Sequence, residues 1–153
     1  MATVSPGQVV GSFRLPVRDG GSVSLWQFKQ RQPVVLVLWE GAGPELLTGF
    51  AERYTAYRRL GAEVLAIGGT DPGMDLPFPV LLDSEGTAAD RLADERPAVL
   101  VLDSFGELFT RWQGDPARRP DHDDLLDWVF FTEVQCEECG PHAENWPRRE
   151  PEA

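Results

Sequence analysis

Two short apolar runs, residues 34–39 and 63–68, are rich in β-branched and large aliphatic side chains and contain few polar ones. Runs of this length and composition are typical of strands buried on both faces of a sheet. Pro44 suits the first position of a helix and Gly61 its end. The residues between them, 44–60, place apolar side chains at helical spacing: Leu46, Leu47, Phe50, Tyr54, Tyr57 and Leu60. The order strand, helix, strand predicts a right-handed parallel crossover.

Shorter patterns surround this unit. Residues 22–28 alternate polar and apolar side chains and predict a short strand or turn, while residues 79–82 predict another short strand. Residues 84–94 fit a short helix with Ser84 as its N-cap. A β-hairpin with a four-residue turn is predicted by the two apolar runs that follow, at residues 98–102 and 107–112.

The region after Trp112 differs in character from the rest of the chain. Residues 114–121 indicate a loop, and a helix is predicted from Asp121 to about residue 135. Its expected apolar stripe consists of Leu125, Leu126, Val129 and Phe130. Acidic residues outnumber arginines between residues 115 and 153, so this part of the chain adds to the negative charge of the molecule.

Composition limits the classes of function. The length of 153 residues and a hydrophobic fraction of 42% fit one globular domain. The net charge of -11 argues against nucleic acid or an anionic membrane as the main partner. The apolar runs are far shorter than the ~20 residues that a membrane span needs. Because the N-terminus also has neither a basic start nor an apolar signal core, a cytoplasmic protein is expected.

The loop between residues 39 and 44 has the form of an active-site elbow. A buried strand ends at Trp39, a turn of Glu40, Gly41, Ala42 and Gly43 follows, and a helix then begins. Many enzymes place a nucleophile at such a turn, but this turn contains no serine, threonine or cysteine. Glu40 at this place would act as a base, imitate an anionic ligand, or stabilise the positive end of the helix.

Five segments in order resemble the redoxins, the peroxiredoxin-like (alkyl hydroperoxide reductase and thiol-specific antioxidant) family of the thioredoxin fold. They read VGSFRLPVRDGGSVSLWQF, PVVLVLW, ERYTAYRRLGAEVLAIGGTDP, LPFPVLLDSEGTAADRLA and RPAVLVLDSFGELFTRWQG. The resemblance implies an α/β thioredoxin-like fold with a mixed central sheet flanked by helices. We therefore expect a redoxin domain at residues 1–114, with an acidic helix and tail at residues 115–153 packed on it.

The same resemblance shows what the elbow lacks. Redoxins carry cysteines at the positions that Glu40 and Gly43 hold here, and the thiolate is activated by the helix start and a nearby arginine. Without sulfur, the standard peroxide chemistry is excluded at this loop. Two supporting positions remain: Pro97 matches the cis-proline of the thioredoxin fold, and Arg96 lies near the place of the activating arginine. Each residue also has an interpretation without function: Pro97 would only shape the entry to the strand, and Arg96 would only be a solvated charge.

A second candidate site follows the acidic helix in the segment Cys136-Glu137-Glu138-Cys139. Two cysteines with two residues between them can form a reversible dithiol–disulfide pair. The glutamates between them disfavour the thiolate by charge repulsion, which fits a slow redox pair better than a fast nucleophile. Cys136, Cys139 and His142 alternatively supply part of a zinc site, with His122 or a carboxylate as fourth ligand. A third interpretation is two ordinary reduced cysteines.

Two functions of different classes follow from these observations. The first is a thiol–disulfide or antioxidant-type redoxin that needs no cofactor, in which Cys136 and Cys139 carry the redox chemistry. The second is an inactive redoxin that binds a partner or acts as a scaffold, with or without zinc. In the second case a binding surface is expected to consist of Trp39, Glu40, Gly43, Arg96 and Pro97. The expected partner is a protein thiol or disulfide, or a small ligand, and the resemblance is compatible with a homodimer.

Overall fold

β3 (Val34–Leu38) is the central strand of a five-stranded sheet in the computed structural model, which describes residues 3–28 and 31–134. It pairs in parallel with β4 (Glu63–Gly68) and antiparallel with β6 (Ala98–Leu102). β5 (Val80–Leu82) and β7 (Leu108–Gln113) form the edges, so the strand order is β5-β4-β3-β6-β7. The predicted parallel crossover and the predicted hairpin are therefore confirmed.

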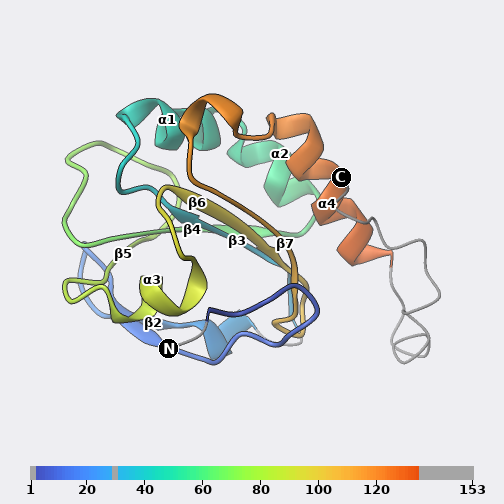
Figure 1. The fold of residues 1–153 in the computed structure, drawn as a ribbon, viewed down its shortest axis with the longest axis horizontal. Helices are drawn as coiled ribbons and strands as arrows, with labels where there is room; N and C mark the ends of the chain where they lie inside the picture. Colours follow the sequence, from blue (N-terminus) through green and yellow to red (C-terminus); the bar gives the residue numbers. More distant parts are fainter. Residues whose placement is uncertain (1–2, 29–30, 135–153) are drawn as a thin grey trace.

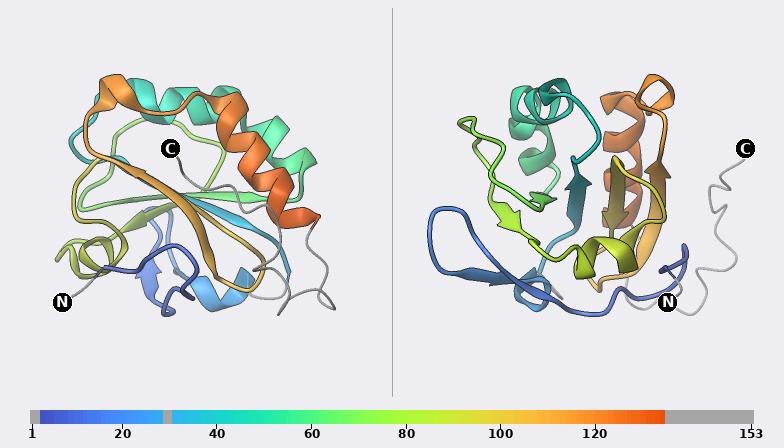
Figure 2. Two further views of the ribbon diagram at one scale, coloured as in Figure 1. Left: turned by 45° about the vertical axis from the view of Figure 1, so that its right-hand side comes forward. Right: turned by 60° about the vertical axis from the view of Figure 1, so that its left-hand side comes forward.

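Helices cover both faces of this sheet (Figures 1 and 2). α1 (Pro44–Glu52), α2 (Tyr54–Arg59) and α4 (His122–Glu133) lie on one face. α3 (Thr87–Leu92) lies on the other face. The N-terminal segment shares that second face and contains β1 (Arg14–Pro16), β2 (Ser22–Ser24) and the 3-10 helix η1 (Leu25–Phe28). A mixed sheet flanked by helices is the arrangement that the resemblance predicted.

The alternation of side chains along β3 divides the core into two apolar clusters. Leu36 points into a cluster shared with α3 and the N-terminal segment, where it packs with Leu92 and Leu25. Val37 points into the opposite cluster, which includes Phe50 of α1 and Val129 of α4. Every residue of β3 is buried, as expected for a strand covered on both faces.

The predicted helix over residues 44–60 is wrong in one respect, because the structure divides it into α1 and α2. Arg53 separates the two helices with φ -109° and ψ 11°, outside the helical region. The break leaves both Phe50 and Tyr57 fully buried, with ring centroids 5.5 Å apart. Periodicity alone did not show this break, because the apolar spacing continues across it.

The prediction that Ser84 caps the next helix is also wrong. α3 begins at Thr87, and its N-cap is Gly86, whose φ of 75° is a left-handed conformation that favours glycine. The buried carboxylate of Asp83 instead accepts hydrogen bonds from the backbone N–H groups of Ala88 and Ala89, at 3.4 and 2.8 Å. Ser84 itself is exposed.

The apolar stripe of α4 is rotated from its predicted position. Leu125 and Val129 are buried as expected, but Phe130 is 55% exposed. The third buried position is Thr132, whose hydroxyl donates a hydrogen bond to the Val129 carbonyl oxygen at 2.7 Å. This bond satisfies the hydroxyl, so a polar side chain is tolerated at the buried position.

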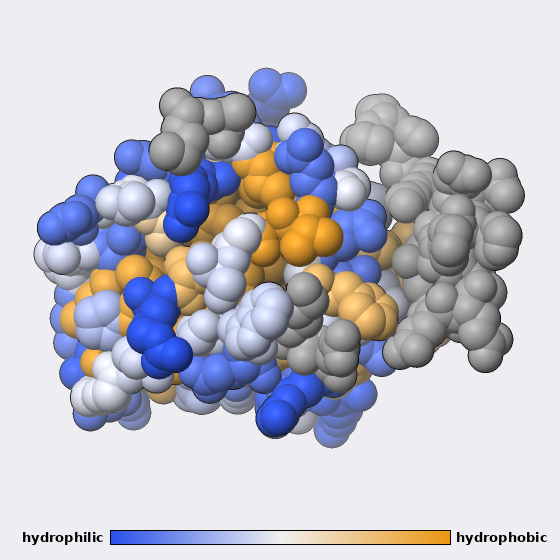
Figure 3. All heavy atoms as spheres, turned by 90° about the horizontal axis from the view of Figure 1, so that it is seen from below, coloured by the Kyte–Doolittle hydropathy of each residue, from blue (hydrophilic) through white to orange (hydrophobic). Residues whose placement is uncertain are grey.

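The N-terminal face of the molecule carries apolar side chains at its surface (Figure 3). A cavity of about 180 Å³ lies there, and Val9, Trp26 and Phe105 line it. Val34 and Leu102 also line the cavity, and these residues pair at the end of β3 that is remote from the elbow. None of the helices among the described residues is long and apolar enough to cross a membrane.

Candidate functional site

The elbow between β3 and α1 packs against the loop that precedes β6. Gly41 has φ +90°, and a Cβ atom there would lie 3.0 Å from the carbonyl oxygen of Arg96 and 3.3 Å from Cδ of Pro97. Both the left-handed backbone and the close approach therefore require glycine at this position. The Arg96–Pro97 peptide bond is cis. The fold thus brings Glu40, Arg96 and Pro97 together from distant parts of the sequence.

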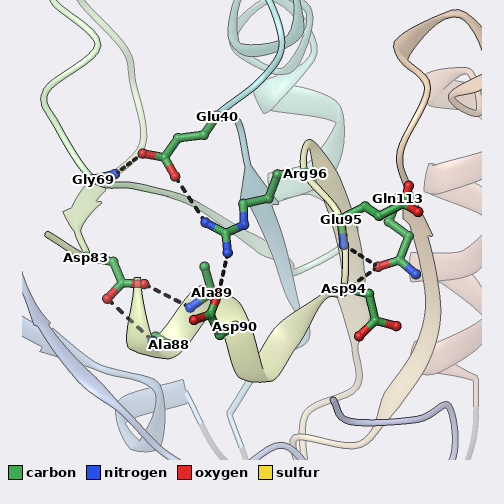
Figure 4. A network of polar contacts seen from close by, with 10 residues as sticks. All are labelled: Glu40, Gly69, Asp83, Ala88, Ala89, Asp90, Asp94, Glu95, Arg96 and Gln113. Atoms are coloured by element: carbon green, nitrogen blue, oxygen red, sulfur yellow. Dashed lines mark hydrogen bonds and ion pairs between the residues drawn. The ribbon is translucent and has the colours of Figure 1, made fainter. Parts of the chain in front are cut away.

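Glu40 is the centre of a polar network at this elbow (Figure 4). The backbone N–H of Gly69 donates a hydrogen bond of 2.7 Å to Glu40 Oε2. Arg96 Nη1 lies 3.4 Å from Glu40 Oε1, and Arg96 Nη2 pairs with the carboxylate of Asp90 on α3. The carboxylate of Glu40 therefore links the end of β4 to the loop before β6. The acidic residue in the first turn of α1 is Glu45, whereas the carboxylate of Glu40 contacts Gly69 and Arg96.

The charges of this network are largely satisfied within the protein. The Arg96 side chain is 27% exposed and contacts two carboxylates, so its charge is already compensated. The side chain of Glu40 is 38% exposed, and water screens its pairing with Arg96. A pair of this kind contributes about 0–1 kcal/mol. The elbow consequently offers an anionic or neutral surface rather than a free cation.

Trp39 and Gly43 frame the elbow without joining the polar network. The indole ring of Trp39 packs on Gly68, where a Cβ atom would lie 2.5 Å from the ring. The indole N–H is buried and has no hydrogen-bond acceptor among residues 3–28 and 31–134. Gly43 is the N-cap of α1 in an extended conformation and offers no capping side chain, while Pro44 occupies the first turn.

The second predicted site, which consists of Cys136 and Cys139 with His142 as an alternative metal ligand, lies outside the described residues. The part of the chain that the structure describes contains no group of three or more His, Cys, Asp or Glu side chains suited to a metal ion. His122, a candidate fourth ligand, lies at the start of α4, where its Nδ1 is 2.8 Å from the hydroxyl oxygen of Tyr57. That contact uses one of its two ring nitrogens.

Three residues at or next to the elbow were not identified from the sequence. Asp90 lies on α3 and joins the network by pairing with Arg96, and the sequence pattern did not indicate this role. The contribution of Gly69 is a backbone N–H, which depends on the register of β3 with β4. Gly41 had a signal, because a glycine directly after a buried strand favours a sharp turn.

The described elbow provides a carboxylate, a guanidinium and backbone amides, but no sulfur. These groups can bind, orient or hold a proton, and none of them is a two-electron reductant. The side chains of the elbow therefore supply no group for thiol chemistry.

Comparison with known proteins identifies relatives of this chain. The AhpC/TSA family matches residues 6–108. Peroxiredoxin Q, chloroplastic, of Gentiana triflora is 34% identical over 101 residues, which cover 59% of this chain and 46% of that protein. Peroxiredoxin Q, chloroplastic, of Triticum aestivum is 36% identical over 92 residues, covering 52% and 42%. The chain thus spans about half the length of the curated relatives it matches.

Solved structures with the same fold include further members of this group. Peroxidoxin BcpB from Mycobacterium tuberculosis superposes with a TM-score of 0.70 at 17% identity, covering 87% of this chain and 99% of that one. The reduced 2-Cys peroxiredoxin of Plasmodium vivax superposes with a TM-score of 0.72 at 15% identity, covering 92% and 84%. At these identities the likeness shows the fold, and it confirms the thioredoxin-like arrangement that the sequence predicted.

Proposed function

The chain belongs to the AhpC/TSA family, and from this premise we propose that it is an antioxidant-type redoxin whose redox chemistry is carried by Cys136 and Cys139 instead of the elbow. The observation that supports this most strongly is the environment of Glu40. The resemblance assigns the family's thiol to the position of Glu40, whose carboxylate accepts a hydrogen bond from Gly69 and pairs with Arg96. Cys136 and Cys139 are the two cysteines of this sequence, so a cysteine-based reaction of this chain would use them.

The proposed reaction transfers two electrons from the cysteine pair. With a disulfide substrate, one thiolate attacks a substrate sulfur and releases the first thiol, and the second cysteine then attacks the mixed disulfide and releases the other. With a hydroperoxide, one thiolate takes an oxygen to form a sulfenic acid and releases an alcohol, and the second thiol displaces water. In both cases Cys136 and Cys139 end as a disulfide and the substrate gains two electrons and two protons.

The test compares the wild type with the double variant Cys136→Ser/Cys139→Ser. The reduced proteins are mixed with one equivalent of hydrogen peroxide or of an oxidised model dithiol, and free thiols and intact mass are measured over time. The wild type is expected to consume the oxidant and lose two hydrogens, and the double variant to be inert. Glu40→Gln serves as the elbow control and is expected to react at the wild-type rate. Equal inertness of the wild type and the double variant would contradict the proposal.

A second function is supported by the elbow network itself. Glu40, Arg96 and Asp90 hold the elbow in an ordered arrangement although it lacks a thiol. A surface kept in this way fits a binding or scaffold protein of the thioredoxin fold. Under this alternative the oxidant assay is negative and Glu40→Ala weakens partner binding. This alternative includes the possibility that the cysteines bind zinc. Elemental analysis of protein purified without chelators tests it, and one zinc ion per binding site is then required.

A further inference from the structure

A cavity of about 250 Å³ lies between the N-terminal segment and α3, on the face of the sheet opposite α1 and α4. Val10, Phe13 and Leu92 are among the residues that line it, and all three belong to the apolar cluster on that face. The volume is just below the ~300–1,000 Å³ of typical small-molecule pockets, which fits a small ligand. Glu40 and Arg96 are not among the lining residues, so the cavity is separate from the elbow.

The walls of this cavity are held together by hydrogen bonds within the protein. The backbone N–H of Val4 donates to the carbonyl oxygen of Arg91 at 3.0 Å, which joins the N-terminal segment to α3. The guanidinium of Arg111, on β7, donates to the carbonyl oxygens of Val4 and Leu92. Because the two walls are already joined, a ligand would not have to order them, and this lowers the cost of binding.

The polar side chains at the cavity are donors. Arg91 is the one charged side chain among the described residues that line it. It is exposed and forms no ion pair within residues 3–28 and 31–134, because its neighbour Asp90 pairs with Arg96 instead. Gln8 also lines the cavity, and its side-chain oxygen accepts a hydrogen bond of 2.9 Å from the backbone N–H of Ser5. The amide nitrogen of Gln8 is then the group that can donate to a ligand.

We infer that this cavity binds a small carboxylic acid with an apolar body. The carboxylate would pair with the Arg91 guanidinium and accept a hydrogen bond from the Gln8 amide, since both groups are donors suited to an anion. The apolar body would be buried against Val10, Phe13 and Leu92.

Charge complementarity at the cavity is local. The whole chain carries a net charge of -11, which repels anions at long range. Salt screens such repulsion beyond ~8 Å at physiological ionic strength, so an adjacent guanidinium dominates for a ligand with a single negative charge. This binding is independent of the cysteine chemistry proposed above, and either proposal can fail without the other.

The test titrates the full chain with hexanoate, with the uncharged hexanamide and with acetate, at neutral pH and constant ionic strength. The backbone amide resonances of Gly11 and Ala88, which line the cavity, are followed by NMR. Both resonances are expected to shift saturably with hexanoate. Hexanamide lacks the charge and acetate lacks the apolar body, so each should bind about fivefold more weakly or worse.

Three variants locate the binding. Arg91→Gln is expected to weaken hexanoate binding about fivefold or more and to leave hexanamide binding unchanged. Gln8→Glu keeps an oxygen acceptor for the N–H of Ser5 but places a carboxylate at the cavity, so hexanoate binding should be lost. Arg59→Gln removes an exposed arginine of α2, on the opposite face of the sheet, and should leave the affinity near the wild-type value.

Several results would overturn the inference. Equal affinities for hexanoate and hexanamide would show that the charge is not recognised, and equal affinities for hexanoate and acetate would show that the apolar residues are not used. An effect of Arg59→Gln as large as that of Arg91→Gln would show only general attraction. The mass of the protein in solution tests a second copy as the occupant. If the wild type is a dimer and Arg91→Gln is a monomer, the cavity belongs to an interface between copies and the assignment to a small acid is wrong.

Discussion

His122 is held between two helices at the point where α4 begins. Its Nδ1 lies 2.8 Å from the hydroxyl oxygen of Tyr57, and its ring meets the ring of Phe50 edge-on, with centroids 4.7 Å apart. Burial lowers the pKa of His122 below its ordinary value, and the cations of Arg53 and Arg119 lower it further. The carboxylates of Asp121 and Asp123 act in the opposite direction, but more weakly.

This environment predicts that acid weakens the fold through His122. The pKa of a histidine in the unfolded chain is about 6.5. As the pH falls below that value, the unfolded state binds a proton at His122 more readily than the folded state does. The free energy of unfolding should therefore decrease from about pH 6.5 down to the lowered folded pKa, with no further loss from this group below it. Urea unfolding at a series of pH values between about 8 and about 5 measures this decrease in the free energy of unfolding.

The matched comparison uses the two histidines of the chain. His122→Asn keeps a hydrogen-bond acceptor for Tyr57 but cannot titrate, so its stability should depend less on pH across that interval than the wild type. His142→Asn should retain the wild-type dependence. An unchanged pH profile in His122→Asn would refute the assignment.

At the scale of elements, α3 shows how a helix start can depend on a residue outside the helix. The carboxylate of Asp83, 5% exposed, accepts from two backbone N–H groups of the first turn. Asp83→Ala leaves both donors without their acceptor and should lower the free energy of unfolding by about 1–3 kcal/mol. Ser84→Ala should change it by less than about 0.5 kcal/mol, because the side chain is exposed. Chemical denaturation of both variants measures whether the Asp83 carboxylate stabilises the start of α3 and whether Ser84 contributes.

The elements also show which features a sequence pattern can predict. Strand composition and helical spacing identified the crossover, the hairpin and α4, because each of these depends on local periodicity. The rotation of α4 was predicted incorrectly at Phe130, since the side of a helix that faces a sheet is fixed by packing with distant strands. The partners of Glu40 were not predictable for a related reason. The N–H of Gly69 reaches Glu40 through the register of β3 with β4, and Asp90 joins the network through its side-chain pairing with Arg96.

The whole molecule depends on one sheet whose two faces are covered by different parts of the chain. On the helical face, Leu125 and Val129 of α4 pack in the same apolar cluster as Val35 and Val37 of β3. Removing α4 would expose the central strand, so residues 122–133 should unfold together with the sheet and not as a separate unit. We therefore expect the redoxin core and α4 to unfold as one cooperative structure, although the family match ends at residue 108.

Leu125→Ala tests this cooperativity. Leu125 is 4% exposed, and its truncation should lower the free energy of unfolding by about 2–5 kcal/mol. Native-state hydrogen exchange should show the same loss for the slowest amides of β3 as for those of α4. Phe130→Ala is the control on the same helix. Because Phe130 is 55% exposed, its truncation should lower the free energy of unfolding far less and should leave the slow amide exchange of α4 and β3 nearly unchanged. If Leu125→Ala accelerated exchange in α4 while β3 kept its protection, the helix would be an independently unfolding addition to the sheet.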